Sequence, residues 1–407
     1  MSGLHDFSRS VFSAESSDTQ MGPAPASSSV SRPVQTKGNI FRTLRTMPSS
    51  QLALRLRQDL ASVGYFIQDV VLHALIESLY SCRPLLLEGP PGAGKTHLAE
   101  KLAEVYHLPK AKLSCAEGIQ REQVLYTWNR SLQQMYLAQE RERGRALEEI
   151  QAEIYGLSFL DAGPVLKAFS WSMQGNPGIL IIDEIDKLSP GASDMLLEPF
   201  SEWSISIEYY SGPPVHLPDP MDRPLVIMTS NDIRHGVSAP LRNRALYAYL
   251  TPPTLEERIR ILHHNGSSLS MDVFRSAVDI LERIQLQLKL IDPPGLRKGT
   301  AFIQSLAQKK ITALTAEVLE HHLCYLTSNE SDYKRLRNFI PSLIEQSHFP
   351  PPELKRLVEQ HYAVVNNTVA ESSPLISQAL VACTEITEQL DGLFTTIAQD
   401  HSHGLPC

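Results

Sequence analysis

The segment GPPGAGKT at residues 89–96 constrains the fold of this chain more than any other feature. It fits the pattern G-x-x-x-x-G-K-[ST], in which Gly89, Gly94, Lys95 and Thr96 hold the fixed positions. Glycines there let successive backbone N–H groups surround an anion, and the helix that follows adds partial positive charge. The segment therefore predicts a nucleotide phosphate site. The alternative is an ordinary glycine and proline turn between a strand and a helix.

The flanking sequence supplies the context that this pattern requires. Residues 85–87 are three leucines, which predict a buried strand, and residues 97–106 have helical spacing. Lys95 is expected to reach the β and γ phosphates, and the Thr96 hydroxyl is expected to bind Mg²⁺. The loop residues predicted to bind the nucleotide are Gly89, Pro90, Pro91, Gly92, Ala93, Gly94, Lys95 and Thr96.

Two carboxylates follow a second apolar run. Asp183 and Glu184 come directly after four apolar residues, 179–182. Because ligands bind at the carboxyl ends of parallel strands, we expect both side chains beside the phosphate loop. Asp183 is predicted to hold Mg²⁺ through water, and Glu184 to orient and deprotonate an attacking water. A chain that merely turns acidic at the end of a strand is the alternative.

Further polar candidates lie downstream. A strand predicted over residues 223–231 ends in Asn231, which is expected to hold the attacking water together with Glu184 unless it only forms a turn. Arg242 and Arg244 follow at the end of a predicted short helix. Guanidinium groups suit phosphate recognition, although paired arginines are commonly surface residues. An arginine supplied by a neighbouring subunit would complete such a site.

Strand and helix patterns alternate along residues 49–252, which predicts an α/β fold with a doubly wound parallel sheet. Residues 123–154 predict a long helical stretch that Gly144 interrupts, and residues 203–217 predict a hairpin. The separation of Lys95 from Asp183 far exceeds the roughly 60 residues that two strand–helix crossovers need, so an insertion is expected between them.

The remaining segments have other compositions. Residues 1–48 are rich in Ser and Pro and predict a disordered tail. Helical patterns with Pro and Gly breaks predict an all-α unit over residues 253–332 and a helical extension over residues 333–407. His401, His403 and Cys407 near the end are expected to be solvated and not metal ligands.

Composition excludes several classes of protein. The formal net charge is −8 with interspersed charges, which disfavours nucleic-acid binding. The five cysteines form no C-x-x-C pair, as expected of reduced thiols in a cytoplasmic protein. We find neither 18 consecutive apolar residues nor the pattern of a secretory signal, so no membrane span is expected.

In this order, the motifs resemble those of the AAA+ superfamily. Asn231 matches its sensor-1 position, the PLRNRA segment its arginine-finger segment, and Arg297 its sensor-2 position on the helical lid. Arg244 aligns with the second arginine of the family segment, so the resemblance favours it over Arg242 as the arginine supplied to a neighbouring subunit. Tyr65, Phe66 and Ile67 fall where such proteins contact adenine, although core packing explains them equally well. Further stretches are similar to the MoxR family and its CoxD-like group, at residues 115–129, 154–169, 182–207 and 229–253.

The resemblance implies an α/β core with an α-helical lid, assembled as a homo-hexameric ring with ATP and Mg²⁺ between subunits. It implies a remodelling chaperone that hydrolyses ATP and acts with a von Willebrand factor A domain partner in maturing metal-cofactor enzymes or protein complexes. The family's YEWN element stands here as YTWN at residues 126–129, so client preference does not transfer. The rival hypotheses are an ATP-gated scaffold with negligible turnover and a nucleic-acid motor.

Overall fold

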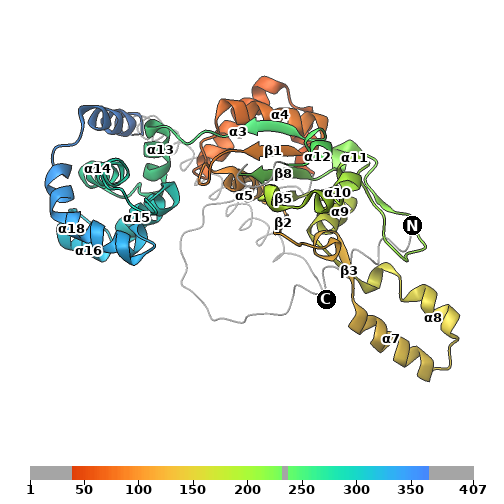
Figure 1. The fold of residues 1–407 in the computed structure, drawn as a ribbon. Helices are drawn as coiled ribbons and strands as arrows, with labels where there is room; N and C mark the ends of the chain where they lie inside the picture. Colours follow the sequence, from red (N-terminus) through yellow and green to blue (C-terminus); the bar gives the residue numbers. More distant parts are fainter. Residues whose placement is uncertain (1–38, 232–236, 366–407) are drawn as a thin grey trace, which may run out of the picture. The chain divides into compact units, whose positions relative to one another are not determined.

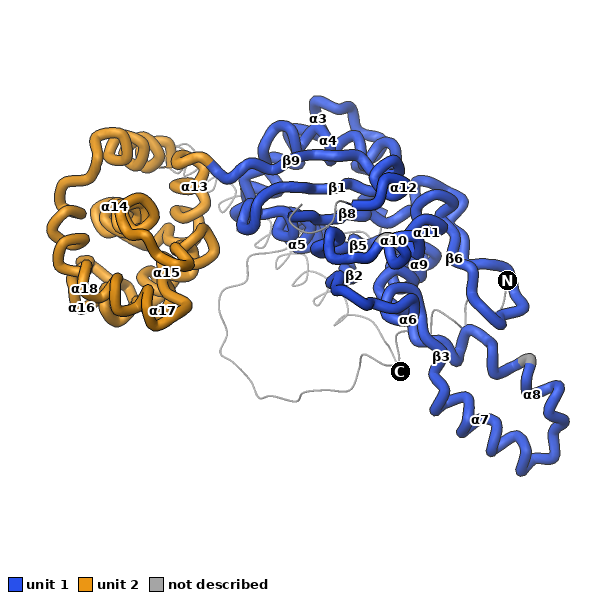
Figure 2. The backbone as a smooth tube through the Cα atoms, viewed as in Figure 1, with its two compact units in different colours: residues 1–253 blue, residues 254–407 orange. Residues whose placement is uncertain are grey.

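The computed structural model describes residues 39–231 and 237–365 (Figure 1). The chain divides into two compact units, residues 1–253 and 254–407, which Figure 2 colours separately and which are described in turn. Residues 1–38 of the predicted tail, and the region that contains His401, His403 and Cys407, lie outside the described residues. No helix in the described ranges combines the length and the apolarity needed to cross a membrane.

A five-stranded parallel sheet in the order β2-β5-β8-β1-β9 forms the centre of the first unit. Alternate residues of each central strand face opposite sides, so that Leu180 and Ile182 join one apolar cluster and Ile179 and Ile181 join the other. The strands are β1 (Leu85–Glu88), β2 (Lys110–Ser114), β5 (Ile179–Asp183), β8 (Leu225–Ser230) and β9 (Leu246–Tyr249).

Helices cover both faces of this sheet (Figure 1), which confirms the predicted doubly wound α/β fold. One face packs against α3 (Ser49–Ser62), α4 (Asp69–Ser81) and α5 (Lys95–Val105). The other packs against α9 (Pro164–Met173), α10 (Pro190–Asp194) and α11 (Leu197–Ser201). Strand β9 was not predicted, because only one residue of its LYAY sequence is buried and the apolar run is short.

The predicted long helix over residues 123–154 is wrong in detail, because this region forms a small sheet and two helices. Strands β3 (Tyr126–Trp128) and β4 (Leu160–Ala162) pair antiparallel. Asn129 accepts a hydrogen bond from the Leu132 amide and thereby starts a new helix. The helices are α6 (Arg121–Val124), α7 (Arg130–Glu142), α8 (Leu147–Glu153) and the short η1 (Leu157–Phe159).

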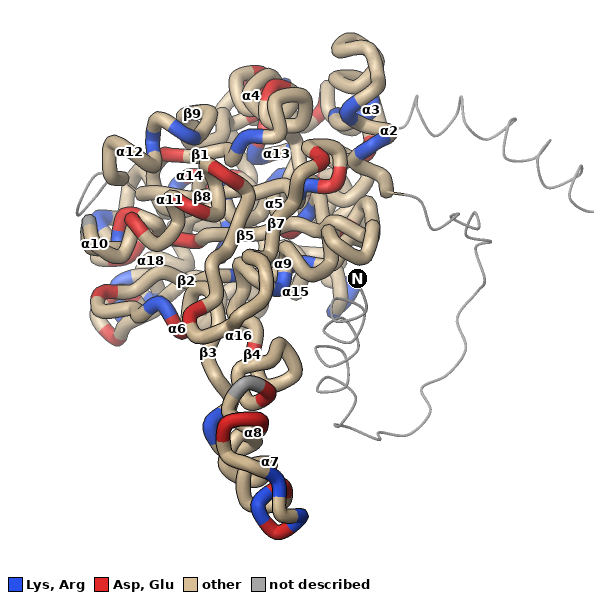
Figure 3. The backbone as a smooth tube through the Cα atoms, turned by 90° about the vertical axis from the view of Figure 1, so that its right-hand side faces the viewer, with Lys and Arg blue, Asp and Glu red and all other residues tan. Residues whose placement is uncertain are grey.

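Figure 3 shows α7 and α8 projecting from the sheet as a helical hairpin, which is the insertion that the spacing predicted. Gly144 turns the chain between them with φ of +78°, a left-handed conformation that glycine adopts without strain. The predicted hairpin at residues 203–217 is also present, as β6 (Ser204–Ile205) and β7 (Val215–His216).

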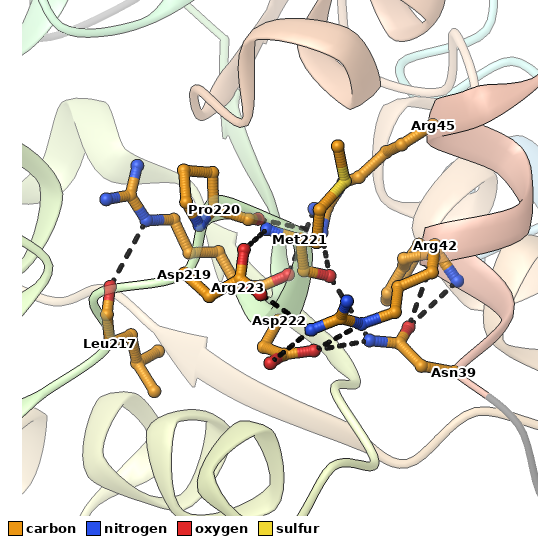
Figure 4. Close-up of polar contacts among 10 residues, drawn as sticks. Asn39, Arg42, Arg45, Leu217, Asp219, Pro220, Met221, Asp222 and Arg223 are labelled. Atoms are coloured by element: carbon orange, nitrogen blue, oxygen red, sulfur yellow. Dashed lines mark hydrogen bonds and ion pairs between the residues drawn. The ribbon is translucent and has the colours of Figure 1, made fainter.

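The prediction of disorder through residue 48 is wrong for residues 39–48, because helix α2 (Ile40–Thr46) packs in the core through Phe41 and Leu44. Arg45 is buried, with only 6% of the residue exposed. It donates to the carbonyl oxygens of Leu79 at 3.1 Å and Met221 at 2.8 Å (Figure 4). Buried carbonyl acceptors thus satisfy the guanidinium, a long-range pairing that composition does not reveal.

The second unit is all helical and has one apolar core. The boundary that we predicted between residues 332 and 333 falls inside α18, and Leu336 and Leu343 of that helix share the core with Phe274 and Phe302. The helices are α13 (Leu255–Asn265), α14 (Met271–Gln287), α15 (Leu296–Gln308), α16 (Ala316–His321), α17 (Leu323–Leu326), α18 (Glu330–Ser347) and a helix over residues 352–365.

A buried histidine predicts that the stability of this unit depends on pH. The His263 ring lies 4.7 Å from the His361 ring and 4.6 Å from the Tyr362 ring. Burial, and then the neighbouring His361 and His264, lower the pKa of His263 to about 4. Burial and the nearby Arg260 also lower the pKa of His361, against the opposing effect of Glu256.

Both folded-state pKa values lie below the ordinary 6.5, so the unfolded chain binds more protons. The contribution is therefore complete above pH 6.5 and is lost as the pH falls toward 4. We expect calorimetry on the full chain to show the melting temperature of this unit dropping by roughly 5 °C or more over that range. His263→Phe should flatten the pH dependence and the exposed His264→Gln should not. An unchanged slope in His263→Phe would show that other groups cause it.

Candidate functional site

The phosphate loop joins β1 to α5 with a backbone that only glycine accommodates at three positions. Gly92 and Gly94 have φ of +83° and +93°, in the left-handed region. A Cβ atom on Gly89 would lie 2.3 Å from the carbonyl oxygen of Leu250. The glycines are thus needed for the loop to curl ahead of the α5 N-terminus, where backbone N–H groups favour anions.

Lys95 is held inside this loop. The residue is 7% exposed, and its Nζ donates to the carbonyl oxygens of Gly89 at 2.8 Å and Pro90 at 2.9 Å. Burial lowers the pKa of Lys95, while the carboxylates of Asp186, Asp183 and Glu184 oppose that effect. Phosphate oxygens in the loop would be stronger acceptors for these protons than neutral carbonyls, because the bond is then charged on both sides.

Asp183 gathers polar groups from three other elements. Its Oδ1 accepts from the hydroxyls of Thr96 at 2.6 Å and Thr229 at 2.7 Å, and its Oδ2 pairs with Lys112 Nζ at 2.7 Å. Burial would raise the pKa of Asp183, but the bonds from Lys112, Thr96 and Thr229 outweigh it and keep the pKa below its usual value. The group is therefore an anion beside the loop.

Glu184 lies next to Asn231, as the order of the strands predicted. The Asn231 amide Nδ2 is 3.5 Å from Glu184 Oε1, and Lys187 pairs with Oε2. Glu184 itself has left-handed backbone angles, with φ of 57°, and its amide donates to the Thr229 hydroxyl at 3.0 Å. Such backbone strain in a non-glycine residue is concentrated at functional sites, where the surroundings enforce it.

The three candidates for adenine contact lie just before α4. Tyr65 packs against the loop, because its hydroxyl is 3.4 Å from the Gly94 carbonyl oxygen. Burial raises the pKa of Tyr65. Ile67 is buried and Phe66 is half-buried. Packing and ligand contact are both compatible with this placement.

The two arginines lie at the opposite edge of the sheet from the loop. Arg242 ends α12 (Ala239–Arg242), and Arg244 precedes β9, which runs parallel to β1. Arg242 is exposed. Arg244 is half-buried, with Nε donating to the Ser201 hydroxyl and Nη1 to the Pro240 carbonyl oxygen at 2.7 Å. The structure therefore does not bring these arginines to the loop of their own chain.

Arg297 belongs to the second unit, where it is exposed in the first turn of α15. Sequence reasoning missed Lys112 and Thr229, which bind Asp183. A usable signal for Thr229 was a polar residue inside a strand that is otherwise apolar. Lys112 alternates with buried residues on β2, which is typical of a solvent-facing residue and gave no indication of a role.

Comparison with known proteins finds that residues 84–245 match the model of a family described as AAA domain (dynein-related subfamily). An uncharacterized protein of Staphylococcus saprophyticus is 33% identical over 32% of this chain and 41% of its own length. The uncharacterized protein YojN of Bacillus subtilis is 30% identical over 37% of this chain and 42% of its own length.

The matched regions span less than half of these relatives. The family match, in contrast, includes the phosphate loop, Asp183, Glu184, Asn231 and both arginines. The parallel sheet and the loop before α5 have the arrangement of that fold. Residues 84–245 of this chain are thus similar to an AAA domain, and the central parallel sheet with its flanking helices fits the α/β P-loop fold.

Proposed function

We propose that this chain binds ATP with Mg²⁺ and hydrolyses it at the carboxyl edge of the sheet. The observation that carries the proposal is the convergence of the phosphate loop, Asp183 and the Glu184–Asn231 pair at one place. Each group occupies the position that its role requires, since the loop follows β1, the carboxylates close β5 and the amide follows β8.

The residues present fit a magnesium ion. The Thr96 hydroxyl and the Asp183 carboxylate are 2.6 Å apart, and hydroxyl and carboxylate oxygens are the ligands that Mg²⁺ prefers. Bound there, the ion would neutralise charge on the β and γ phosphates. Thr229 donates to the same oxygen, Oδ1, and Lys112 pairs with Oδ2, so the Asp183 carboxylate is held in place beside the loop.

Glu184 is the proposed general base. Lys187 pairs with Oε2, which leaves Oε1 beside the Asn231 amide. A water that donates to Oε1 and accepts from Asn231 Nδ2 would be oriented by both groups, and Glu184 would take its proton as the water attacks the γ phosphorus. Tyr65, Phe66 and Ile67 are proposed to complete nucleotide binding because of their place before α4 and the resemblance, and Arg297 is proposed on the resemblance alone.

An arginine from a second copy is proposed to complete the site. Arg242 and Arg244 come just before β9 and therefore lie at the amino edge of the sheet. The phosphate loop follows β1 at the opposite edge, and the four residues of β1 alone span roughly 13 Å between the two edges. Neither arginine is therefore placed to act on the nucleotide of its own chain. Arg242 is the more available of the two, because Arg244 is bonded to Ser201 and Pro240.

Mixing two inactive variants tests whether two copies of the chain share the active site. A double Arg242→Ala, Arg244→Ala protein and a Glu184→Gln protein should each be nearly inactive, and together they should regain partial ATPase activity. Some interfaces in the mixture then combine an intact Glu184 with intact arginines. The measurement is the ATPase rate across mixing ratios, after sizing has verified co-assembly. A flat, inactive profile would refute the contribution in trans, and the single variants would rank the two arginines.

We also propose that the chain forms a homo-hexameric ring in the cytoplasm and acts as a MoxR-type remodelling chaperone. Its partner would carry a von Willebrand factor A domain, and its client would be a metalloenzyme or a protein complex. Support comes from the resemblance of residues 115–129, 154–169, 182–207 and 229–253 to that family. Co-purification with such a partner, dependent on ATP, is the experiment that tests this part.

A steady-state ATPase assay with and without DNA tests the activity itself. The proposal predicts turnover that requires Mg²⁺ and does not respond to DNA. Binding without measurable turnover would indicate a nucleotide-gated scaffold. Turnover that rises severalfold on addition of DNA would indicate a nucleic-acid motor.

A further inference from the structure

Asp186 is a buried carboxylate beside the candidate site, and the proposed reaction gives it no role. The residue is 2% exposed and lies in η2 (Ile185–Lys187), the short turn that follows Glu184 directly. An aspartate is rarely buried this far unless its carboxylate is paired or hydrogen-bonded. The contacts of Asp186 therefore indicate what the carboxylate does in this place.

The Asp186 carboxylate contacts the backbone of a residue that the proposed reaction uses. Its Oδ1 accepts a hydrogen bond from the backbone N–H of Asn231 at 3.1 Å. Asn231 follows the last residue of β8, and its side-chain Nδ2 lies 3.5 Å from Glu184 Oε1. A carboxylate accepts a stronger hydrogen bond than a neutral oxygen does, so this contact fixes the point from which the Asn231 side chain extends.

Two hydrogen bonds tie the turn to the end of β8, and they run in opposite directions. The backbone N–H of Glu184 donates to the Thr229 hydroxyl at 3.0 Å, and the backbone N–H of Asn231 donates to Asp186. The turn itself is closed by the Lys187 amide, which donates to the Glu184 carbonyl oxygen at 2.9 Å. The side chains of Glu184 and Asn231 thus extend from two backbone positions that are fixed relative to each other.

The surroundings of Asp186 suit a supporting group better than a general base. Asp186 is 2% exposed, whereas the side chain of Glu184 is 41% exposed, so water reaches Glu184 more easily. Burial lowers the pKa of Lys95, and Asp186 is the carboxylate that opposes this effect most. Asp186 thus lies close to the ammonium group of the loop, which supplies the opposite charge that a buried carboxylate needs.

We propose that Asp186 is a positioning residue for ATP hydrolysis, which holds the backbone of Asn231 so that its side-chain amide and the Glu184 carboxylate can share one water. The inference rests on the proposed function and extends it to a residue that does not itself contact the water. A shift of about 1 Å in a group that orients a reactant can lower a rate roughly 100-fold, so loss of the Asp186 contact should be visible in turnover.

The first measurement needs no turnover. Exchange of the Asn231 amide hydrogen with solvent is followed by NMR on the full chain, isotope-labelled at asparagine. Asp186→Ala should speed this exchange at least roughly tenfold, whereas Asp186→Asn, whose side-chain oxygen can still accept the bond, should change it much less. Equal exchange rates in Asp186→Ala and the unchanged protein would overturn the inference. Circular dichroism verifies the fold, and Asp186→Ser replaces Asp186→Ala if that variant does not fold.

The second measurement is the ATPase rate at increasing ATP concentration. Asp186→Ala should lower kcat at least roughly tenfold and leave KM within about twofold, because the loop that holds the phosphates is unchanged. Asp186→Asn should retain most of the rate, since its oxygen can still accept from the Asn231 amide. Equal losses in both variants would show that the charge or a proton of the carboxylate is what matters, and would overturn the inference. The exposed Asp194→Ala, at the end of α10, is the matched control and should change neither constant.

A double variant tests whether Asp186 acts through Asn231. In an Asn231→Ala background, Asp186→Ala should lower kcat by no more than about twofold further, because the side chain that Asp186 positions is already absent. An undiminished further loss would show that Asp186 acts by another route and would overturn the inference. Absence of turnover in the unchanged protein would count against the proposed function, and the exchange measurement would still decide whether Asp186 holds Asn231.

Discussion

Glu184→Gln should bind ATP about as well as the unchanged protein and hydrolyse it at least roughly 100-fold more slowly. The amide has the shape of the carboxylate and keeps its place beside Asn231, which is 3.5 Å away. It cannot accept the proton that the attacking water must lose. Binding is measured with a fluorescent ATP analogue, and turnover is measured as phosphate release.

The exposed Glu202→Gln is the matched control, because it makes the same chemical change at the end of α11, away from the site. It should leave both measurements unchanged. Turnover by Glu184→Gln within a fewfold of the unchanged protein would show that another group is the base, and Asp186, whose Oδ1 accepts from the backbone N–H of Asn231 at 3.1 Å, would be examined next.

Lys95→Ala should weaken ATP binding by roughly 100-fold or more, since charged hydrogen bonds to phosphate contribute about 3 kcal/mol. The Lys95 ammonium lies at the centre of the loop and is 2.8 Å from the Gly89 carbonyl oxygen. Calorimetric titration with ATP and Mg²⁺ measures the effect, and circular dichroism verifies the fold.

Lys110→Ala, exposed at the start of β2, removes the same charge away from the loop and should bind ATP normally. Tight binding by Lys95→Ala would mean that the loop is a structural turn and that the nucleotide site lies elsewhere.

The parts of the site that sequence predicts are those set by short-range chemistry. The loop glycines can be recognised in the sequence because the loop geometry requires them. Gly92 and Gly94 have a left-handed backbone, and a Cβ atom on Gly89 would lie 2.3 Å from the Leu250 carbonyl oxygen. Asp183 and Glu184 could be placed beside the loop because a continuous apolar strand leads to them and parallel strands end at a common edge.

The parts that sequence missed depend on partners far along the chain. Arg45 looks like a polar residue in a Ser-rich and Pro-rich tail, yet carbonyls about 175 residues away hold it in the core. Lys112 looks like a solvent-facing strand residue until β2 pairs with β5 and Asp183 comes within 2.7 Å. The helical pattern of residues 123–154 gave no warning that β3 would pair with β4, because three-residue strands carry little periodicity.

A single-turnover experiment tests most directly whether this chain hydrolyses the ATP that it binds. Protein in excess is loaded with γ-labelled ATP, Mg²⁺ is added, and labelled phosphate is followed over time beside Glu184→Gln. Our account predicts a first-order release from the unchanged protein and retention of intact ATP by the variant. Intact ATP on both proteins over the same period would contradict it, and would leave a domain that holds nucleotide without consuming it.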